Sequence, residues 1–137
     1  MYTNGSVSAR MPAWVSSVVT ANGIFCAGSG LVLLVASRPL AQFLGPVEAV
    51  MPAFPLLGII LFLYGSLLVW LARTGRINRH LVAVMAELDI AWVLGSYGLL
   101  FWGGLAWTNA GKWTIILIAE IVFTFALAQA IAWWKGR

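Results

Sequence analysis

Four long apolar runs, separated by short polar interruptions, dominate the hydrophobic pattern of this 137-residue chain. A helix needs about 20 residues to cross a hydrocarbon core of about 30 Å, and each run reaches that length. Because the runs are continuously apolar, they present no polar face for water to cover. The pattern therefore predicts an all-α protein with four membrane-spanning helices, at about 13–36, 50–72, 81–101 and 113–134.

Short connections leave no room for a second domain. The segments 37–49, 73–80 and 102–112 join consecutive runs. Pro52 and Pro55 fall in the first turns of the second run, where proline is tolerated because the first helical N–H groups lack intrahelical partners. We expect one transmembrane four-helix bundle over residues 1–137, in which the first run is retained and not cleaved as a signal peptide.

The composition agrees with an integral membrane protein. Hydrophobic residues make up 62% of the chain and charged residues 9%, whereas soluble domains carry about 25% charged residues. These values exclude a soluble enzyme and a nucleic-acid-binding domain, and loops beside anionic headgroups account for the net charge of +4. The single cysteine, Cys26, excludes an intrachain disulfide, and the single histidine, His80, is too few for a bis-histidine haem.

Basic residues are divided unevenly between the two ends of the predicted helices. One side would carry Arg10, Arg73, Arg76, Arg79, Lys135 and Arg137, and the other side Arg38 and Lys112. Because Lys and Arg are retained in the cytoplasm, this bias predicts that both termini are cytoplasmic. The loop arginines Arg73, Arg76 and Arg79 are also basic enough to hold anionic lipid headgroups, although topology alone explains them.

An internal repeat is one interpretation of the first and third runs, which align at an offset of 67 residues. Five pairs match at this offset: Asn22 with Asp89, Phe25 with Trp92, Gly28 with Gly95, Ser29 with Ser96, and Leu33 with Leu100. A true repeat would make the protein two parallel hairpins related by an axis along the membrane normal. Chance explains the match equally well, because small residues are frequent in membrane helices. The glycines and serines of these pairs are predicted to pack at helix contacts.

Polar side chains at membrane depth are the most informative candidates for function, because they are costly there and normally face protein or water. A rise of about 1.5 Å per residue places at least one such group from each run near the midplane. The members of this layer are Asn22, Tyr64, Glu87, Asp89 and Glu120. No Lys or Arg lies within the runs to pair with the acids, so we expect at least one acid to be protonated.

Helix geometry separates two of these acids. Glu87 and Asp89 are two residues apart and so point to nearly opposite sides of a helix. We therefore expect one acid to meet the bundle core and the other a second interface, with another protomer or a partner subunit. In a structural role, neutral Asp89 bonds Asn22, and Glu120 bonds Tyr64 or a backbone carbonyl. In a functional role, the layer forms a proton- or cation-coupled pathway.

Other patterns indicate helix packing and not chemistry. Small residues recur at a spacing of four, in the pairs Gly23 and Ala27, Ala91 and Gly95, Ala126 and Ala130, and Ala128 and Ala132. Such pairs let helices approach closely and favour oligomerisation. No Gly-rich phosphate loop, metal-ligand spacing or nucleophile–base pair is present in the sequence, which therefore predicts neither an enzyme nor a metal site. The sequence leaves open whether the helices bind a cofactor, lipid or pigment.

Two stretches of the chain resemble a group of small four-span bacterial inner-membrane proteins with no assigned activity. They are Ala21-Asn22-x-x-Phe25 through Ser29-Gly30-Leu31-x-Leu33-Leu34, and Leu88-Asp89-x-Ala91-Trp92-Val93-Leu94-Gly95-Ser96. The resemblance covers most of the chain and implies architecture and bacterial origin only. Small multidrug-resistance transporters match less well, because their essential glutamate lies in the first helix and the first run here contains no acid.

With almost no mass outside the predicted membrane region, the chain can act mainly through lateral helix contacts or through a pore. We expect a non-enzymatic structural or accessory subunit of a membrane complex. Its expected partners are membrane lipids and other transmembrane subunits or copies of itself, and not nucleic acid. The alternative is a small proton- or cation-linked transporter or channel that works through Glu87, Asp89 and Glu120.

Overall fold

The structure is a computed structural model that describes residues 11–135. Within this range every regular element is a helix, as expected. In chain order the helices are α2 (Ala13–Val35), α3 (Ser37–Leu44), α4 (Val47–Val50), α5 (Phe54–Arg73), α6 (Arg79–Trp102) and α7 (Asn109–Lys135). Of these, α2, α5, α6 and α7 are each long and apolar enough to cross a membrane. The chain is therefore all-helical over this range and has the composition of a multi-pass membrane protein.

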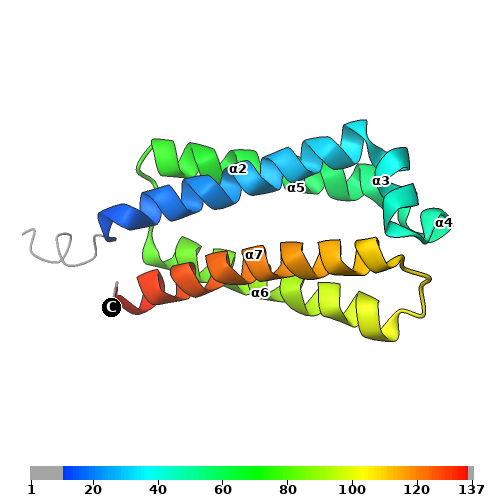
Figure 1. Ribbon diagram of the computed structural model, residues 1–137. Coiled ribbons are helices and arrows are strands. Elements are labelled where there is room, and N and C mark those ends of the chain that lie inside the picture. Colours follow the sequence, from blue (N-terminus) through cyan, green and yellow to red (C-terminus); the bar gives the residue numbers. More distant parts are fainter. Residues whose placement is uncertain (1–10, 136–137) are drawn as a thin grey trace, which may run out of the picture.

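The four long helices form two antiparallel pairs (Figure 1). α2 lies along α5 and α6 lies along α7, with extensive contact within each pair, whereas contact between the pairs is sparser. The first residues of α2, the α5–α6 connection and the last turn of α7 lie at one end of the array, which we call the α5–α6 end. The short helices α3 and α4 and the α6–α7 connection lie at the other end, which we call the α3–α4 end.

Close contact between α2 and α5 depends on glycine. A Cβ atom on Gly23 would lie 2.7 Å from the carbonyl oxygen of Gly65, and one on Gly30 would lie 2.5 Å from that of Gly58. Ala27, which is paired with Gly23 at the predicted spacing of four, also contacts Gly65 through its backbone. Two backbones that meet through small residues are the packing that membrane helices use, since lipid provides no hydrophobic driving force between helices.

Gly28 and Gly95, which we expected at helix contacts, do not lie there. Both residues are exposed, and a Cβ atom on either would meet no atom within 4 Å. Gly28 is two residues from Gly30, so it points about 200° away from the side that meets α5. Ser29 is half-buried, and the Ser96 hydroxyl donates to a carbonyl oxygen of its own helix at 2.8 Å. The internal repeat stays a prediction.

The second long helix begins later than we expected. We placed its start near residue 50, but α4 ends at Val50, a turn covers residues 51–53, and α5 begins at Phe54. Pro55 lies in the first turn of α5, as predicted, whereas Pro52 lies in the preceding turn. The physical reason is that proline has no N–H to donate to the carbonyl four residues earlier, so α4 cannot continue into α5.

The connection after α2 is largely helical, which we did not predict. α3 buries Ala41 and Leu44, and Gly45 ends it with a φ of 121°. Thr108, from the α6–α7 connection, donates its backbone N–H to the Leu44 carbonyl oxygen at 2.8 Å and its hydroxyl to that of Phe43 at 2.7 Å. These bonds tie the two helix pairs together at the α3–α4 end.

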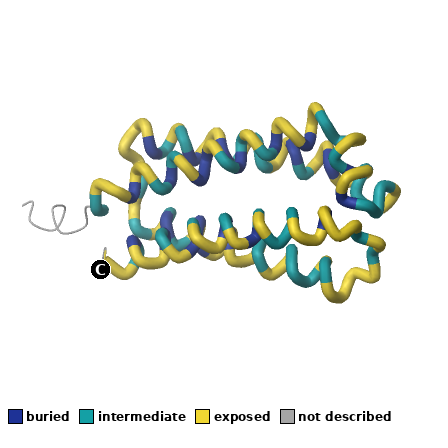
Figure 2. Tube along the Cα trace, in the orientation of Figure 1, coloured by how far each residue is buried: buried dark blue, intermediate teal, exposed yellow. Residues whose placement is uncertain are grey.

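Most buried positions of the long helices lie on the sides that face the interior of the array (Figure 2). The buried apolar side chains form two clusters. At the α5–α6 end all four long helices contribute, through Val15, Val19, Leu68, Ala72, Val82, Met85 and Ala132. At the α3–α4 end the buried residues are Leu33, Ala41, Leu44 and Phe54. Between the two clusters, polar side chains occupy the interior.

Candidate functional site

A hydrogen bond between α2 and α6 joins the two helix pairs near the middle of the array. Asn22 Nδ2 donates to Asp89 Oδ2 at 2.9 Å, and the Cys26 thiol donates to Asn22 Oδ1 at 3.4 Å. Asn22 is 0% exposed and Asp89 is 4% exposed, so both groups are shielded from the surroundings of the bundle. The bond that we expected between Asp89 and Asn22 is therefore present, and it lies in the interior.

Gln129 of α7 is a third buried polar residue, and we did not predict it. Its side chain is 0% exposed, and neither Oε1 nor Nε2 has a hydrogen-bond partner among residues 11–135. An unpaired buried polar group costs about 1–3 kcal/mol, so buried amides are nearly always paired. A signal in the sequence could have revealed Gln129, because it lies at helical spacing in a stripe of small apolar residues, Ala119, Val122, Ala126 and Ala132.

Gln129 lies at nearly the same depth as Asp89. α6 and α7 run antiparallel, and Tyr97 of α6 bonds Glu120 of α7. Counting along both helices from that pair brings Gln129 level with Leu88, which is one residue, or about 1.5 Å along the axis, from Asp89. Because both side chains are buried, the amide and the carboxyl group share the interior of the array at this level.

Tyr64 of α5 adds a polar group from the fourth long helix. Its hydroxyl is buried and has no hydrogen-bond partner among the described residues, and Tyr64 is next to Gly65, which meets the backbone of Gly23 and Ala27 in α2. The indole N–H of Trp92, one turn along α6 from Asp89, is likewise unpaired within residues 11–135. We call Asn22, Tyr64, Asp89 and Gln129 the polar centre, to which each long helix contributes one residue.

Glu87 points away from the polar centre, as its two-residue offset from Asp89 predicts. It is exposed and contributes to an open groove between α6 and α7, which we call the α6–α7 groove. The residues that line this groove are Ala83, Ala86, Glu87, Ala130 and Trp133. The two acids therefore face different surroundings, as we expected.

Glu120 is also exposed and bonds a different tyrosine from the one that we expected. Tyr97 Oη donates to Glu120 Oε1 at 2.8 Å. The prediction that Glu120 bonds Tyr64 or a backbone carbonyl is wrong, because the helix that packs along α7 is α6 and not α5. Glu87 and Glu120 thus lie outside the polar centre, on the surface of the α6–α7 pair.

Two arginines at the α5–α6 end contact tryptophan rings. The guanidinium carbon of Arg76 lies 5.3 Å from the ring centroid of Trp70, and that of Arg79 lies 4.4 Å from the ring centroid of Trp133. Arg79 Nε also donates to the Trp133 carbonyl oxygen at 3.1 Å, while Arg73 is exposed. Cation–π contacts of this kind attract a guanidinium to the ring face, so they hold two positive charges at this end.

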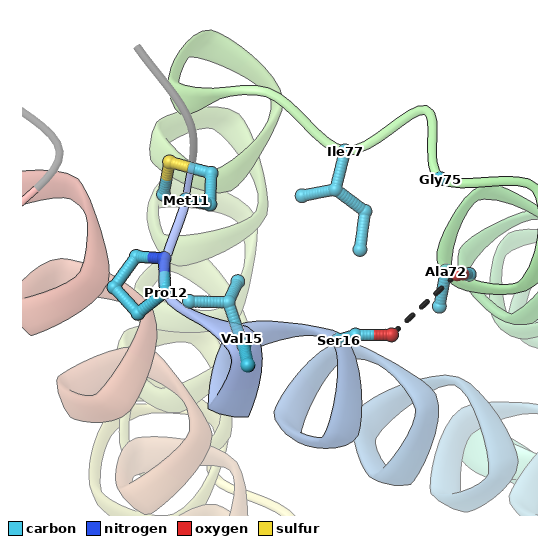
Figure 3. A pocket seen from close by; sticks show the side chains of 8 residues that line it. Met11, Pro12, Val15, Ser16, Ala72, Gly75 and Ile77 are labelled. Atoms are coloured by element: carbon cyan, nitrogen blue, oxygen red, sulfur yellow. Dashed lines mark hydrogen bonds between the residues drawn. The ribbon is translucent and has the colours of Figure 1, made fainter. Parts of the chain in front are cut away.

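A hollow of about 300 Å³ opens at the same end, beside the start of α2 (Figure 3). Its lining consists of Met11, Pro12, Ala13, Val15, Ser16, Ala72, Gly75 and Ile77. Ser16 Oγ donates to the carbonyl oxygen of Ala72 at 3.5 Å, as the dashed line in Figure 3 marks. The hollow is mostly apolar and its hydroxyl is engaged, so it offers little to orient a polar ligand.

The chemistry of the polar centre follows from its groups. It combines one carboxyl group with two amides and a phenol, which can donate and accept hydrogen bonds or present oxygen atoms to a small cation. Within residues 11–135, no group of three or more His, Cys, Asp and Glu side chains is placed to hold a metal ion. No protein-family model, curated protein or solved structure matches the chain.

Proposed function

We propose that this chain is an accessory subunit of a bacterial inner-membrane complex and binds a transmembrane helix of a partner protein at the α6–α7 groove. The observation that carries the proposal is the exposed carboxyl group of Glu87 in this groove. A rise of about 1.5 Å per residue places Glu87 about 12 Å from the start of α6 at Arg79. An acid at the centre of a lipid-facing helix costs about 2.5–3.5 kcal/mol, so a partner that covers Glu87 removes an unfavourable contact.

The lining of the groove is suited to a helix. Three of its residues, Ala83, Ala86 and Ala130, carry only a methyl group and let another backbone approach closely. Trp133 borders the groove toward the α5–α6 end. A helix seated between α6 and α7 would contact these alanines and bring a hydrogen-bond donor to Glu87.

The occupant that fits is a helix of a different protein. Glu87 calls for a donor at its own depth, and a Lys or Arg side chain would neutralise it as well. Among residues 11–135 the basic residues lie at the ends of the long helices or outside them, at Arg38, Arg73, Arg76, Arg79, Lys112 and Lys135. This part of a second copy therefore has no cation to offer at that depth.

Interhelical bonds support a scaffold role for the rest of the bundle. The Asn22–Asp89 bond links the two helix pairs in the interior, and the bonds of Thr108 link them at the α3–α4 end. Bonds between membrane helices are worth about 0.6–2 kcal/mol each and set helix register. They hold the α6–α7 pair against the rest of the bundle, and the Tyr97–Glu120 bond links α6 to α7.

Site-specific cross-linking in native membranes tests this function. A photoreactive amino acid at Ala130, in the groove, should form an adduct with a transmembrane helix of another protein. Glu87→Leu should remove that adduct, and Glu87→Gln, which keeps hydrogen bonding, should retain part of it. The same photoreactive group at Ile59, which is 48% exposed on α5, is the matched control and should give adducts with lipid only.

Mapping the adduct makes the test specific. The captured segment must be a transmembrane helix with a Lys or Arg near the cross-link, and replacing that residue with leucine must abolish capture. Adducts at Ala130 with lipid alone, or with a second copy of this chain alone, would contradict the proposal. So would an unchanged adduct in the Glu87→Leu protein.

For orientation, we propose that the α5–α6 end faces the cytoplasm. The described basic residues at this end are Arg73, Arg76, Arg79 and Lys135, and the other end has Arg38 and Lys112. Arg10 and Arg137, which we also counted toward the cytoplasmic side, lie outside the described residues. A phosphatase that works only in the periplasm should be inactive when fused after residue 137, and a fluorescent protein that matures only in the cytoplasm should fluoresce there. Phosphatase activity at that position would reverse the orientation.

A further inference from the structure

Within residues 11–135, Asp89 has no positive partner. The hydrogen bond that it accepts from Asn22 comes from a neutral amide, and its side chain is 4% exposed. The basic residues among these positions lie at the ends of the long helices or outside them. An ionised carboxylate buried without a counter-charge costs several kcal/mol. A proton or a bound cation must therefore neutralise Asp89.

Neutral oxygen atoms with unused bonding capacity are buried in the same middle part of the bundle as this carboxyl group. Gln129 Oε1 and Tyr64 Oη are buried and have no hydrogen-bond partner among residues 11–135. Gln129 lies within about 1.5 Å of the depth of Asp89. Tyr64 is next to Gly65, which meets the backbone of α2 at Gly23, the residue after Asn22. A network with a purely structural role would pair these atoms, as nearly all buried polar atoms are paired. Carboxylate and neutral oxygen atoms together are the ligands that hard cations prefer.

We propose that the polar centre binds one monovalent metal cation, for which sodium is the probe. Asp89 supplies the negative charge, and Gln129 and Tyr64 supply neutral oxygen ligands. One buried carboxylate balances one positive charge, whereas a divalent ion would leave an excess positive charge in the interior. The site lies inside the bundle and not at the α6–α7 groove, so it does not depend on the partner proposed there.

Sodium binding by the purified full-length chain in lipid nanodiscs tests the proposal. Radioactive sodium should bind saturably, with one ion per chain, and unlabelled NaCl should displace it whereas choline chloride should not. The fluorescence of the eight tryptophans gives a second readout, the unfolding temperature. It should rise with NaCl beyond its value in choline chloride of equal ionic strength, because a ligand that binds only the folded state stabilises that state.

Three variants assign the binding to the polar centre. Asp89→Asn removes the charge but can still accept a hydrogen bond from Asn22, so it should fold and bind no sodium. Gln129→Leu removes one neutral ligand and should weaken sodium binding roughly tenfold or more. Glu120→Gln is the matched control, because Glu120 is an exposed acid bonded to Tyr97 outside the centre, and it should bind sodium as the unmodified protein does.

The outcomes separate the cation from a proton. Absence of sodium binding by the folded, unmodified protein would overturn the proposal and show that a proton neutralises Asp89. Sodium binding that the Asp89→Asn protein retains would also overturn it. Displacement of sodium by calcium at equal concentration would overturn the assignment of a monovalent ion.

Discussion

Gly30→Leu should separate α2 from α5 and lower the free energy of unfolding by about 3 kcal/mol or more. A Cβ atom at this position would lie 2.5 Å from the Gly58 carbonyl oxygen and 2.6 Å from the Phe62 backbone nitrogen. Both are backbone atoms of α5, which cannot move aside unless the whole helix shifts. Overpacking usually costs about 1–3 kcal/mol, and here no flexible side chain is available to relieve it.

Gly28→Leu is the matched control, because it makes the same change two residues away on the same helix. A Cβ atom on Gly28 would meet no atom within 4 Å, so the leucine should be tolerated. It should even stabilise α2 slightly, since glycine within a helix costs about 0.5–1 kcal/mol relative to alanine. Equilibrium unfolding of both variants in one detergent, followed by circular dichroism, measures the difference. Equal stability of the two variants would refute glycine-mediated packing of α2 on α5.

Asn22→Leu should destabilise the protein more than the double variant Asn22→Leu with Asp89→Leu. The single change leaves Asp89 buried without its partner, which costs about 1–3 kcal/mol and more if the acid is charged. Replacing both partners with apolar groups can be nearly neutral. Asp89→Leu alone should lose an interhelical bond worth about 1 kcal/mol, and Asp89→Asn should be close to the unmodified protein because its amide oxygen can still accept.

A double-mutant cycle gives the coupling free energy between Asn22 and Asp89. It compares the unmodified protein, Asn22→Leu, Asp89→Leu and the double leucine variant. We expect a coupling free energy of about 0.6–2 kcal/mol, the range for bonds between membrane helices. Unfolding free energies measured in the same detergent supply the cycle, and a helical circular dichroism spectrum shows that each variant folds. Strictly additive effects of the two single changes would mean that the bond between α2 and α6 does not contribute to stability.

The four long helices were predictable because segments as apolar as these are suited to the hydrocarbon core of a membrane. In hydrocarbon a backbone N–H or C=O group has no water to bond, so an isolated apolar segment of about 20 residues pairs its own backbone groups as a helix. The boundaries were less predictable where local chemistry intervened. Pro52 moved the start of α5 from the expected position near residue 50 to Phe54.

The short helix α3 was missed for a different reason. Its eight residues are too few to form a stable helix alone, because helix nucleation is costly and short isolated helices are marginal. It forms against the bundle, where Ala41 and Leu44 are buried and Thr108 bonds the carbonyl oxygens of Phe43 and Leu44. The residues that make those contacts are far apart in the sequence, so no local sequence pattern predicts the contacts.

The contacts of the polar residues were also predictable only in part. Depth follows from counting residues along a helix, so the Asn22–Asp89 contact could be predicted from the sequence. The two-residue offset of Glu87 likewise placed it on the other side of α6. The partner of Glu120 and the burial of Gln129 depend instead on how each helix is rotated and which helix it meets.

Sequence alone is thus enough for the number of long apolar helices, the approximate depth of each polar group and the relative direction of two side chains on one helix. Tertiary packing is needed to know which side of each helix faces inward. In a soluble protein, the contrast between apolar and polar residues marks the buried side. A membrane helix is apolar on its lipid side as well as its protein side, so that contrast is lost, and small residues such as Gly30 and Gly58 select the contact through steric fit.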